Sequence, residues 1–213
     1  MKIGVLGTGV VGQTLAGKLL SLGHDVMLGA RSADNEKVVA FAARTGGKAG
    51  SFGDAIRHGE LVINGTRGDG SIAAIRQGAD HLAGKTLIDV SNPLDFSKGF
   101  PPSLSISNTD SLGESIQREF PAARVVKSLN TLNASLMIDP GQLPGQHTVF
   151  VSGNDASAKG QTMDLLRSFG WQSIIDLGDI TTARGVEEYV ALWVRLLGAL
   201  GTPEFNIAVV RKG

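Results

Sequence analysis

The stretch "VLGTGVVGQTLAGKLLSLGHDVMLGARS" (residues 5–32) decides the fold. Its Gly7, Gly9 and Gly12 form a G-x-G-x-x-G pattern between a short apolar run and a segment with helical spacing of apolar residues. In such a βαβ unit the first glycine permits a tight turn and the second lets the backbone approach a pyrophosphate. The third lets the helix pack closely on the strand. The other loop residues would offer backbone N–H groups to the phosphates: Thr8, Val10 and Val11.

The second apolar run of this stretch ends in Arg31 and Ser32, where sequences that prefer NAD carry an acidic residue. A carboxylate there would repel a 2′-phosphate, whereas arginine offers it planar, bidentate contacts and serine adds a donor. Asp34 and Glu36 follow slightly later, at positions typical of the next helix's first turn. The stretch therefore predicts NADP as the cofactor. The alternative reading of Arg31 is a solvated surface charge or a lid over the adenine.

Beyond this stretch, short apolar runs alternate with segments of helical spacing. The runs predict strands over 2–7, 24–29, 48–50, 60–65, 85–90, 123–129 and 147–153, with an edge strand over 172–178. The helical segments are 11–22, 34–45, 71–82, 111–119 and 156–169. Such alternation is typical of a doubly wound α/β Rossmann fold with a mostly parallel sheet. We expect residues 1–213 to form a single NADP-binding domain.

The last long helical pattern, over 180–198, has an apolar stripe that leaves Glu187 to one side. This stripe is read either as a helix packing on its own sheet or as a subunit interface and pocket wall. We expect residues 179–213 to form a C-terminal helix and tail that contribute to a dimer and to the pocket. The proline-rich segment 97–105 is expected to be an ordered surface loop.

Composition excludes several classes of function. The 213 residues carry 20 basic and 20 acidic side chains, so no basic excess points to nucleic acid. The absence of cysteine excludes disulfides and thiolate chemistry and fits a reducing compartment. The four histidines show no metal-ligand spacing, and no apolar run approaches the roughly 20 residues of a membrane span. We expect a cytoplasmic protein without a metal, membrane or nucleic-acid partner.

Polar residues follow three of the predicted strands, where open α/β sheets bind their ligands. Asn64, Thr66 and Arg67 lie at or after the end of the strand predicted over 60–65. Ser91, Asn92 and Pro93 follow the strand over 85–90, and Ser128, Asn130 and Thr131 lie at or after the end of the strand over 123–129. We expect a site for the nicotinamide, its ribose and its carboxamide there, formed by Thr66, Ser91, Asn92, Pro93 and Asn130. Lys127 lies inside a strand pattern; it is expected to extend its ammonium toward solvent and is assigned no chemistry.

The sequence shows no His/Asp or Lys/Asp pair at the strand ends, which proton transfer in an alcohol dehydrogenase would need. Hydride transfer to a flavin-like ring needs positioning more than acid–base chemistry, so no catalytic residue is predicted. Two alternatives remain open. One is an NADP-dependent dehydrogenase or imine reductase of a small metabolite, and the other is a non-enzymatic NADP(H)-sensing module.

The chain resembles the NADPH-dependent oxidoreductases typified by coenzyme F420:NADP oxidoreductase. The segments that carry the resemblance are "IGVLGTGVVGQTLAGKLLSLGHDVMLGARS", "DVSNPLD", "VVKSLNTLN", "VFVSGNDASAK" and "LLGALGTPEFNIAVVR". The cytosolic domain of six-transmembrane ferrireductases is similar. The resemblance implies a homodimer with NADP in the Rossmann cleft, held by Thr8, Val10, Val11, Arg31 and Ser32. It also implies that a flavin-like or deazaflavin acceptor stacks on a nicotinamide near Ser91, Asn92, Pro93 and Asn130.

Overall fold

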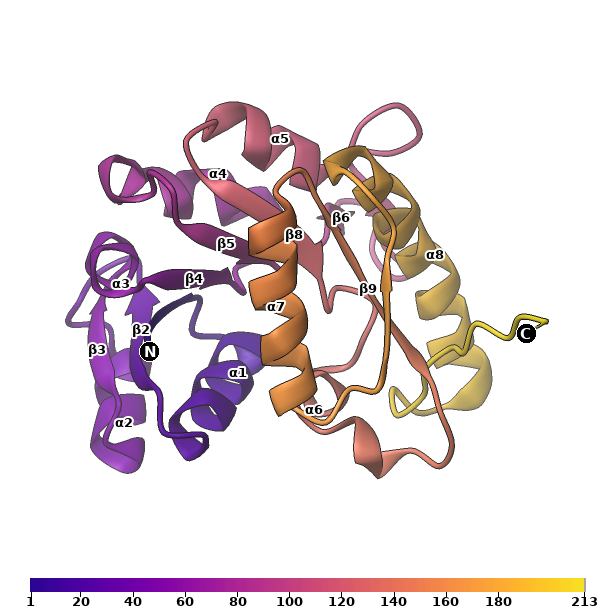
Figure 1. The fold of residues 1–213 in the computed structure, drawn as a ribbon, viewed down its shortest axis with the longest axis horizontal. Helices are drawn as coiled ribbons and strands as arrows, with labels where there is room; N and C mark the ends of the chain where they lie inside the picture. Colours follow the sequence, from indigo (N-terminus) through magenta and orange to yellow (C-terminus); the bar gives the residue numbers. More distant parts are fainter. Residues whose placement is uncertain (213) are drawn as a thin grey trace.

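A computed structural model describes residues 1–212 and has a Rossmann-like α/β fold around one eight-stranded sheet (Figure 1). The strand order is β10-β9-β8-β5-β4-β1-β2-β3. Its strands are β1 (Lys2–Leu6), β2 (Asp25–Ala30), β3 (Lys48–Ser51), β4 (Leu61–Asn64), β5 (Thr86–Asp89), β8 (Arg124–Ser128), β9 (Thr148–Gly153) and β10 (Ser173–Asp176). Each coincides with a predicted apolar run, and β10 lies at the sheet edge as expected.

Helices cover both faces of the sheet (Figure 1). They are α1 (Val10–Ser21), α2 (Glu36–Thr45), α3 (Phe52–His58), α4 (Gly68–Arg76), α5 (Leu112–Glu119), α6 (Ala134–Ile138), α7 (Ala156–Ser168) and α8 (Ala183–Leu200). One buried cluster joins the sheet to α1, α2, α6 and α7, and a second joins it to α3, α4, α5 and the start of α8. The strands read as continuous apolar runs because both of their faces are buried.

The sheet is parallel except at one pair. β8 and β9 run antiparallel, with Val126 opposite Gly153, and β10 then runs parallel to β9. The six strands from β8 to β3 therefore end at the same edge of the sheet, where the glycine loop and the predicted polar clusters lie. This shared edge positions the candidate site.

Two predictions of local structure need correction. The helix expected over 71–82 begins earlier, at Gly68, ends at Arg76, and is followed by a separate 3₁₀ helix, Ala79–His81. A Cβ at Gly78 would lie 2.7 Å from the Cβ of Ile56, so this connection packs closely on α3. The loop expected over 97–105 contains β7 (Ser103–Leu104), which pairs with β6 (Leu94–Asp95) in a short hairpin.

The C-terminal helix α8 is held against α5 by side chains of its first two turns. Arg184 donates to the carboxylate of Glu114 through Nε at 2.8 Å and Nη2 at 2.5 Å. Glu187 accepts the backbone N–H groups of Leu112 and Gly113 at 2.8 and 3.0 Å, and is 1 % exposed. The prediction that Glu187 lies off the buried stripe is therefore wrong, because the start of α5 and a buried lysine satisfy its charge.

The chain beyond α8 returns to the sheet. The N–H of Thr148, at the start of β9, donates to the carbonyl of Ile207 at 2.9 Å, and Phe205 stacks on Trp193. Figure 1 shows α8 and this tail together on one side of the molecule. Within residues 1–212, no helix is both long enough and apolar enough to cross a membrane.

Candidate functional site

The glycine loop after β1 has the three properties that a phosphate-binding turn requires. Gly7 has a φ of +109°, which favours glycine. A Cβ at Gly12 would lie 1.9 Å from the carbonyl oxygen of Gly7, so only glycine lets α1 approach the loop. A Cβ at Gly9 would meet nothing within 4 Å, so the backbone there faces open space. The first N–H groups of α1, which have no partners within the helix, are therefore accessible to an anion.

A cavity of about 420 Å³ lies beside this loop. It is lined by Gly7, Thr8, Gly9, Arg31, Phe52, Gly65, Thr66, Arg67, Asp69, Gly70 and Ala74. We call it the adenosine-side cavity. Two guanidinium groups line it, from Arg31 at the end of β2 and Arg67 before α4, and the half-buried ring of Phe52 adds an aromatic wall. Such a lining suits an anionic ligand that also has a flat ring.

The two arginines of this cavity differ in their partners. Arg67 donates to Asp69 at 2.9 Å, and both side chains are largely exposed. Arg31 is exposed and forms no salt bridge with any residue that the structure describes, so its guanidinium is available to a ligand. The neighbouring Ser32 donates its hydroxyl to the carboxylate of Asp34. Ser32 is thus engaged with the chain, and Asp34 precedes α2 instead of lying in its first turn.

A second cavity, of about 180 Å³, continues along the strand ends. It is lined by Val11, Gly65, Thr66, Arg67, Gly68, Val90, Ser91, Asn92, Leu94 and Phe96. We call it the nicotinamide-side cavity. It shares Gly65, Thr66 and Arg67 with the adenosine-side cavity, so the two form one cleft that passes the glycine loop. Phe96, from the hairpin, is 48 % exposed and gives the far end an aromatic rim.

A buried polar network supports the shared wall. The side-chain amide of Asn64 donates to Asp89 at 2.8 Å and to Ser71 at 3.0 Å, and its oxygen accepts the Thr66 hydroxyl at 2.6 Å. Ser91 donates its hydroxyl to Asp89 at 2.6 Å. These bonds fix the turns after β4 and β5 to each other, so the polar residues that face the cleft are held rigidly.

Lys127 lies beneath this network and corrects two expectations. It is 0 % exposed instead of reaching solvent, and its ammonium lies 2.7 Å from Asp89, 2.6 Å from the carbonyl of Ser91 and 2.7 Å from Glu187. A Lys/Asp pair is therefore present at the strand ends. Burial acts to lower the pKa of Lys127, but the two carboxylates outweigh it and the pKa lies above its ordinary value of 10.5. Lys127 lines neither cavity, so its ammonium does not contact a ligand in the cleft.

The two asparagines predicted at the nicotinamide form a reciprocal pair. Asn92 donates to the backbone carbonyl of Asn130 at 2.8 Å, and Asn130 donates to the side-chain oxygen of Asn92 at 2.9 Å. The second amide hydrogen of Asn130 goes to the carbonyl of Val186 in α8, at 2.9 Å. Both amide hydrogens of Asn130 are therefore used within the protein, which leaves Asn92 as the asparagine that faces the cleft.

The cleft brings together most of the residues predicted from the sequence. Those that line it are Gly7, Thr8, Gly9, Val11, Arg31, Thr66, Ser91 and Asn92. Those outside its lining are Val10, Gly12, Ser32, Pro93 and Asn130. Val10 is exposed at the start of α1, and Gly12 packs on Gly7. Pro93 is buried, and its carbonyl accepts from Ser105 of the hairpin.

Sequence reasoning missed Phe52, Asp69 and Phe96 in the lining, and Glu187 beneath it. Phe52 was missed because it begins a short helix, α3, that the pattern of apolar residues did not predict. Phe96 was missed because it belongs to the hairpin of β6 and β7, which was also not predicted. Lys127 and Asp89 did carry a signal, since both interrupt apolar strands close to the same sheet edge. A buried charged side chain is normally paired with a side chain of opposite charge.

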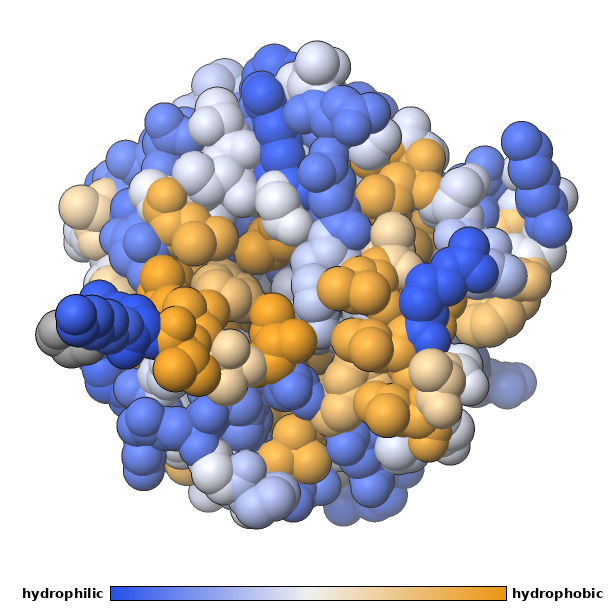
Figure 2. Space-filling view, turned by 90° about the vertical axis from the view of Figure 1, so that its right-hand side faces the viewer, coloured by the Kyte–Doolittle hydropathy of each residue, from blue (hydrophilic) through white to orange (hydrophobic). Residues whose placement is uncertain are grey.

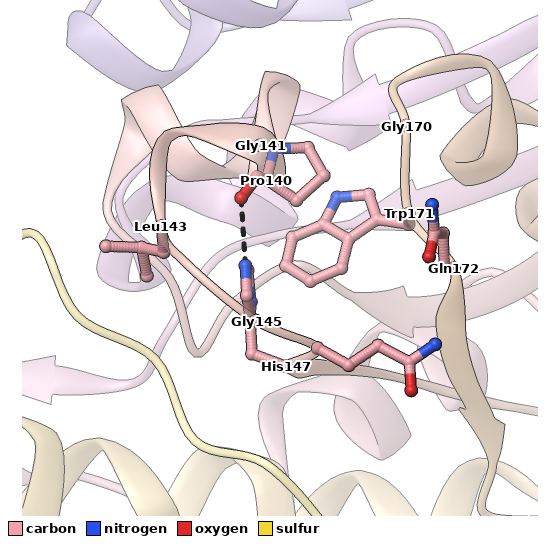
Figure 3. Close-up of a pocket in the computed structure, with 9 residues that line it drawn as sticks. Pro140, Gly141, Leu143, Gly145, His147, Gly170, Trp171 and Gln172 are labelled. Carbon is pink, nitrogen blue, oxygen red and sulfur yellow. Dashed lines mark hydrogen bonds between the residues drawn. The ribbon is translucent and has the colours of Figure 1, made fainter.

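A third cavity, of about 110 Å³, lies beside the start of β9 and shares no lining residue with the cleft (Figure 3). His147 and Trp171 meet there edge to face with ring centres 5.0 Å apart, and Nε2 of His147 lies 2.9 Å from the carbonyl of Pro140. The small glycine-rich lining and the engaged histidine give this cavity no reactive group. Among residues 1–212, no group of three or more acidic or histidine side chains could hold a metal ion.

Comparison with known proteins identifies relatives along the whole chain. The family described as NADP oxidoreductase, coenzyme F420-dependent, matches residues 2–93. A crystal structure of a candidate F420-dependent NADP-reductase from Arthrobacter sp. FB24 superposes with a TM-score of 0.95 at 54 % identity, covering 99 % of this chain and 100 % of that one. The F420-dependent NADP reductase of Methanocaldococcus jannaschii is 27 % identical over 92 % of each chain.

A further relative is much longer than this chain. The metalloreductase STEAP3 of Rattus norvegicus is 29 % identical over 95 % of this chain, but the match spans only 38 % of the metalloreductase. The similarity therefore concerns one part of that protein.

Proposed function

Since the chain belongs to the coenzyme F420-dependent NADP oxidoreductase family, we propose that it transfers a hydride between NADPH and a flavin-like or deazaflavin acceptor. Membership makes it an NADP-dependent oxidoreductase. The observation that carries the more specific proposal is the continuous cleft beside the glycine loop. Among the described residues, one end of this cleft has a guanidinium without a salt-bridge partner, and the other has an apolar rim and no titratable group besides Arg67.

The residues of the cleft fit NADP part by part. The open backbone at Gly9 and the start of α1 would hold the pyrophosphate. Arg31 would hold the 2′-phosphate, because its guanidinium lies at the end of β2 with no salt-bridge partner among the described residues. Phe52 would cover the adenine, and Ser91 and Asn92 would hold the nicotinamide ribose and carboxamide. Arg67 lines both cavities and would contact the pyrophosphate from the opposite side.

The proposed reaction needs positioning from the protein and no proton donor. When bound, NADPH supplies a hydride from its nicotinamide ring, and the reduced acceptor gains its proton from solvent. The hydroxyl of Thr66 is hydrogen-bonded to Asn64, and the hydroxyl of Ser91 is hydrogen-bonded to Asp89. These bonds orient both side chains before a ligand binds. Leu94 and Phe96 form an apolar edge against which a flat acceptor would pack. This apolar edge supports our proposal of a flavin-like or deazaflavin heterocycle as the acceptor in preference to a small carbonyl compound.

We also propose a homodimer formed through α8 and the tail. Figure 2 faces the side of the molecule on which α8 and the tail lie in Figure 1, and shows apolar side chains gathered on it. The exposed large apolar side chains of these elements are Leu192, Leu200, Val209 and Val210. An exposed patch of this kind is typical of an association surface. Sedimentation equilibrium should give twice the chain mass of 22.2 kDa.

Binding followed by an acceptor screen tests the proposal. We expect NADPH to bind at least tenfold more tightly than NADH, equivalent to about 1.4 kcal/mol or more. Oxidation of bound NADPH should then be rapid with a deazaflavin or FMN and slow with small ketones or imines. Tight binding with a fast imine reaction and a bell-shaped pH profile would instead favour the small-metabolite reductase. Tight binding without oxidation by any acceptor would favour a sensing module.

A further inference from the structure

We infer that Lys127 is a positioning residue for the nicotinamide side of the cleft, acting with Asn130 to tie the Ser91–Asn92 turn to helix α8. The inference rests on the proposed function. It assigns a role to a buried charge cluster that faces no solvent and lines neither cavity.

Lys127 makes the first of two parallel links. Its ammonium donates to Asp89, the last residue of β5, at 2.7 Å, and to the carbonyl of Ser91, in the turn after β5, at 2.6 Å. It also lies 2.7 Å from Glu187 of α8. Since an ammonium has three hydrogens, these three acceptors satisfy it completely and leave none for a ligand.

Asn130 makes the second link, three residues further along the chain. Its amide group donates to the side chain of Asn92, at 2.9 Å, and to the carbonyl of Val186 in α8, also at 2.9 Å. Each link therefore starts from the end of β8, holds one residue of the turn after β5, and reaches one of two adjacent residues of α8. Lys127 and Asn130 therefore hold the turn at two successive residues, Ser91 and Asn92.

The buried charges make the first link rigid. Asp89, Lys127 and Glu187 are all at most 2 % exposed at their side chains, so separating any of them would leave an unpaired charge out of contact with water. Glu187 is held in turn by the N–H groups of Leu112 and Gly113 at the start of α5. These contacts attach the turn to α8. None of the residues in these links lines the adenosine-side cavity, so we expect the larger effect on the nicotinamide side.

The affinity for NADPH relative to that for 2′,5′-ADP separates this role from a general effect on folding. Both ligands would use the glycine loop and Arg31, but only NADPH would reach Ser91 and Asn92. In Lys127→Met we expect NADPH affinity to fall tenfold or more while 2′,5′-ADP affinity stays within twofold. Glu187→Gln keeps the Lys127 ammonium but weakens its contact with α8. It should lower the NADPH affinity about threefold, again with little change in the affinity for 2′,5′-ADP. If Lys127→Met fails to fold, Glu187→Gln alone tests the inference.

Arg184→Gln is the matched control, because it removes the neighbouring ion pair between α8 and α5 without touching the turn. It should leave the ratio of the two affinities unchanged. Equal losses for both ligands in the Lys127 and Glu187 variants, or no loss for either, would overturn the inference. If the unmodified protein bound 2′,5′-ADP but not NADPH, or neither ligand, the proposed function itself would fail, which is a distinct result.

Discussion

The ammonium of Lys127 lies 2.7 Å from Oε1 of Glu187, and neither side chain reaches solvent. This contact joins a strand of the nucleotide-binding sheet to the C-terminal helix directly behind the candidate nicotinamide site. It makes α8 part of the architecture of the cleft as well as an exposed surface for a partner. The nicotinamide-side cavity can then present polar groups held in place from behind, while Lys127 and Glu187 themselves stay out of its lining.

Arg31→Gln should remove the preference for NADPH. The arginine lines the adenosine-side cavity and has no salt-bridge partner in residues 1–212, so the substitution would remove the proposed contact to the 2′-phosphate and little else. We expect NADPH affinity to fall at least tenfold, or about 1.4 kcal/mol, with NADH affinity unchanged by fluorescence titration. Arg195→Gln, an exposed change on α8 with the same loss of charge, should alter neither. Parallel losses for both nucleotides would mean that Arg31 contacts something other than the 2′-phosphate.

Arg67→Gln should weaken NADPH and NADH by the same factor, about three- to tenfold. Arg67 lines both cavities, at the position where we propose that the pyrophosphate shared by the two nucleotides binds. Asp69 now holds this guanidinium at 2.9 Å in an exposed pair of small energetic value, so Asp69→Asn should tighten both ligands. Titrations at 50 and 300 mM salt should show a smaller salt dependence in Arg67→Gln. A loss restricted to NADPH would place Arg67 on the 2′-phosphate instead.

Two glycines of one loop should respond to alanine in opposite ways. Gly9→Ala adds a methyl group that meets no protein atom within 4 Å, on an extended backbone with φ −75°, so stability should be preserved. NADPH affinity should nevertheless fall tenfold or more, because the methyl group occupies the approach to the phosphates. Gly12→Ala would place its Cβ 1.9 Å from the carbonyl of Gly7 and should lower the free energy of unfolding by about 1–3 kcal/mol. Normal NADPH binding by Gly9→Ala would contradict the assignment of the loop.

How far the sequence predicts this fold depends on the range of the interactions involved. The strands and the glycine turn follow from local patterns, since a buried parallel strand is apolar throughout and the loop needs glycine at fixed spacings. The reversed direction of β9 does not follow, because an apolar run has the same appearance in either direction. Helix α3 was missed because its seven residues are too few for a periodic signal.

The candidate site divides in the same way. Arg31, Ser91 and Asn92 follow strand ends, so their convergence on one cleft could be anticipated. The contact of Lys127 with Glu187 joins residues 60 positions apart through tertiary packing, and an apolar stripe on α8 gave no reason to bury an acid. Hydrophobic patterns identify what packs together, whereas a buried ion pair depends on where two separate elements meet.

Acid should weaken the attachment of α8 through Glu114. Hydrogen bonds from Arg184 lower the pKa of Glu114 from its ordinary 4.5, against the opposing effect of burial. A carboxylate with a lowered pKa stabilises the folded state fully above about pH 4.5, and that contribution is lost as pH falls through the folded-state pKa. Glu114→Gln should cost about 1–3 kcal/mol at pH 7 and show a shallower loss of stability below pH 4.5.

Urea unfolding at a series of pH values measures both effects of Glu114→Gln. The control is Glu119→Gln, which removes an exposed ion pair with Arg76 and should change the free energy of unfolding by less than about 1 kcal/mol. An unchanged pH dependence in Glu114→Gln would show that the Arg184 contact does not hold α8 in place.

Direct transfer of hydrogen between two rings is the central claim, and isotope transfer tests it most directly. NADPH carrying deuterium at either face of nicotinamide C4 would be mixed with the protein and a deazaflavin, whose C5–H does not exchange with solvent. Mass spectrometry of the reduced deazaflavin should find the label from one face of NADPH only, with full retention. NADPH oxidation that leaves the deazaflavin unlabelled from both faces would contradict direct transfer.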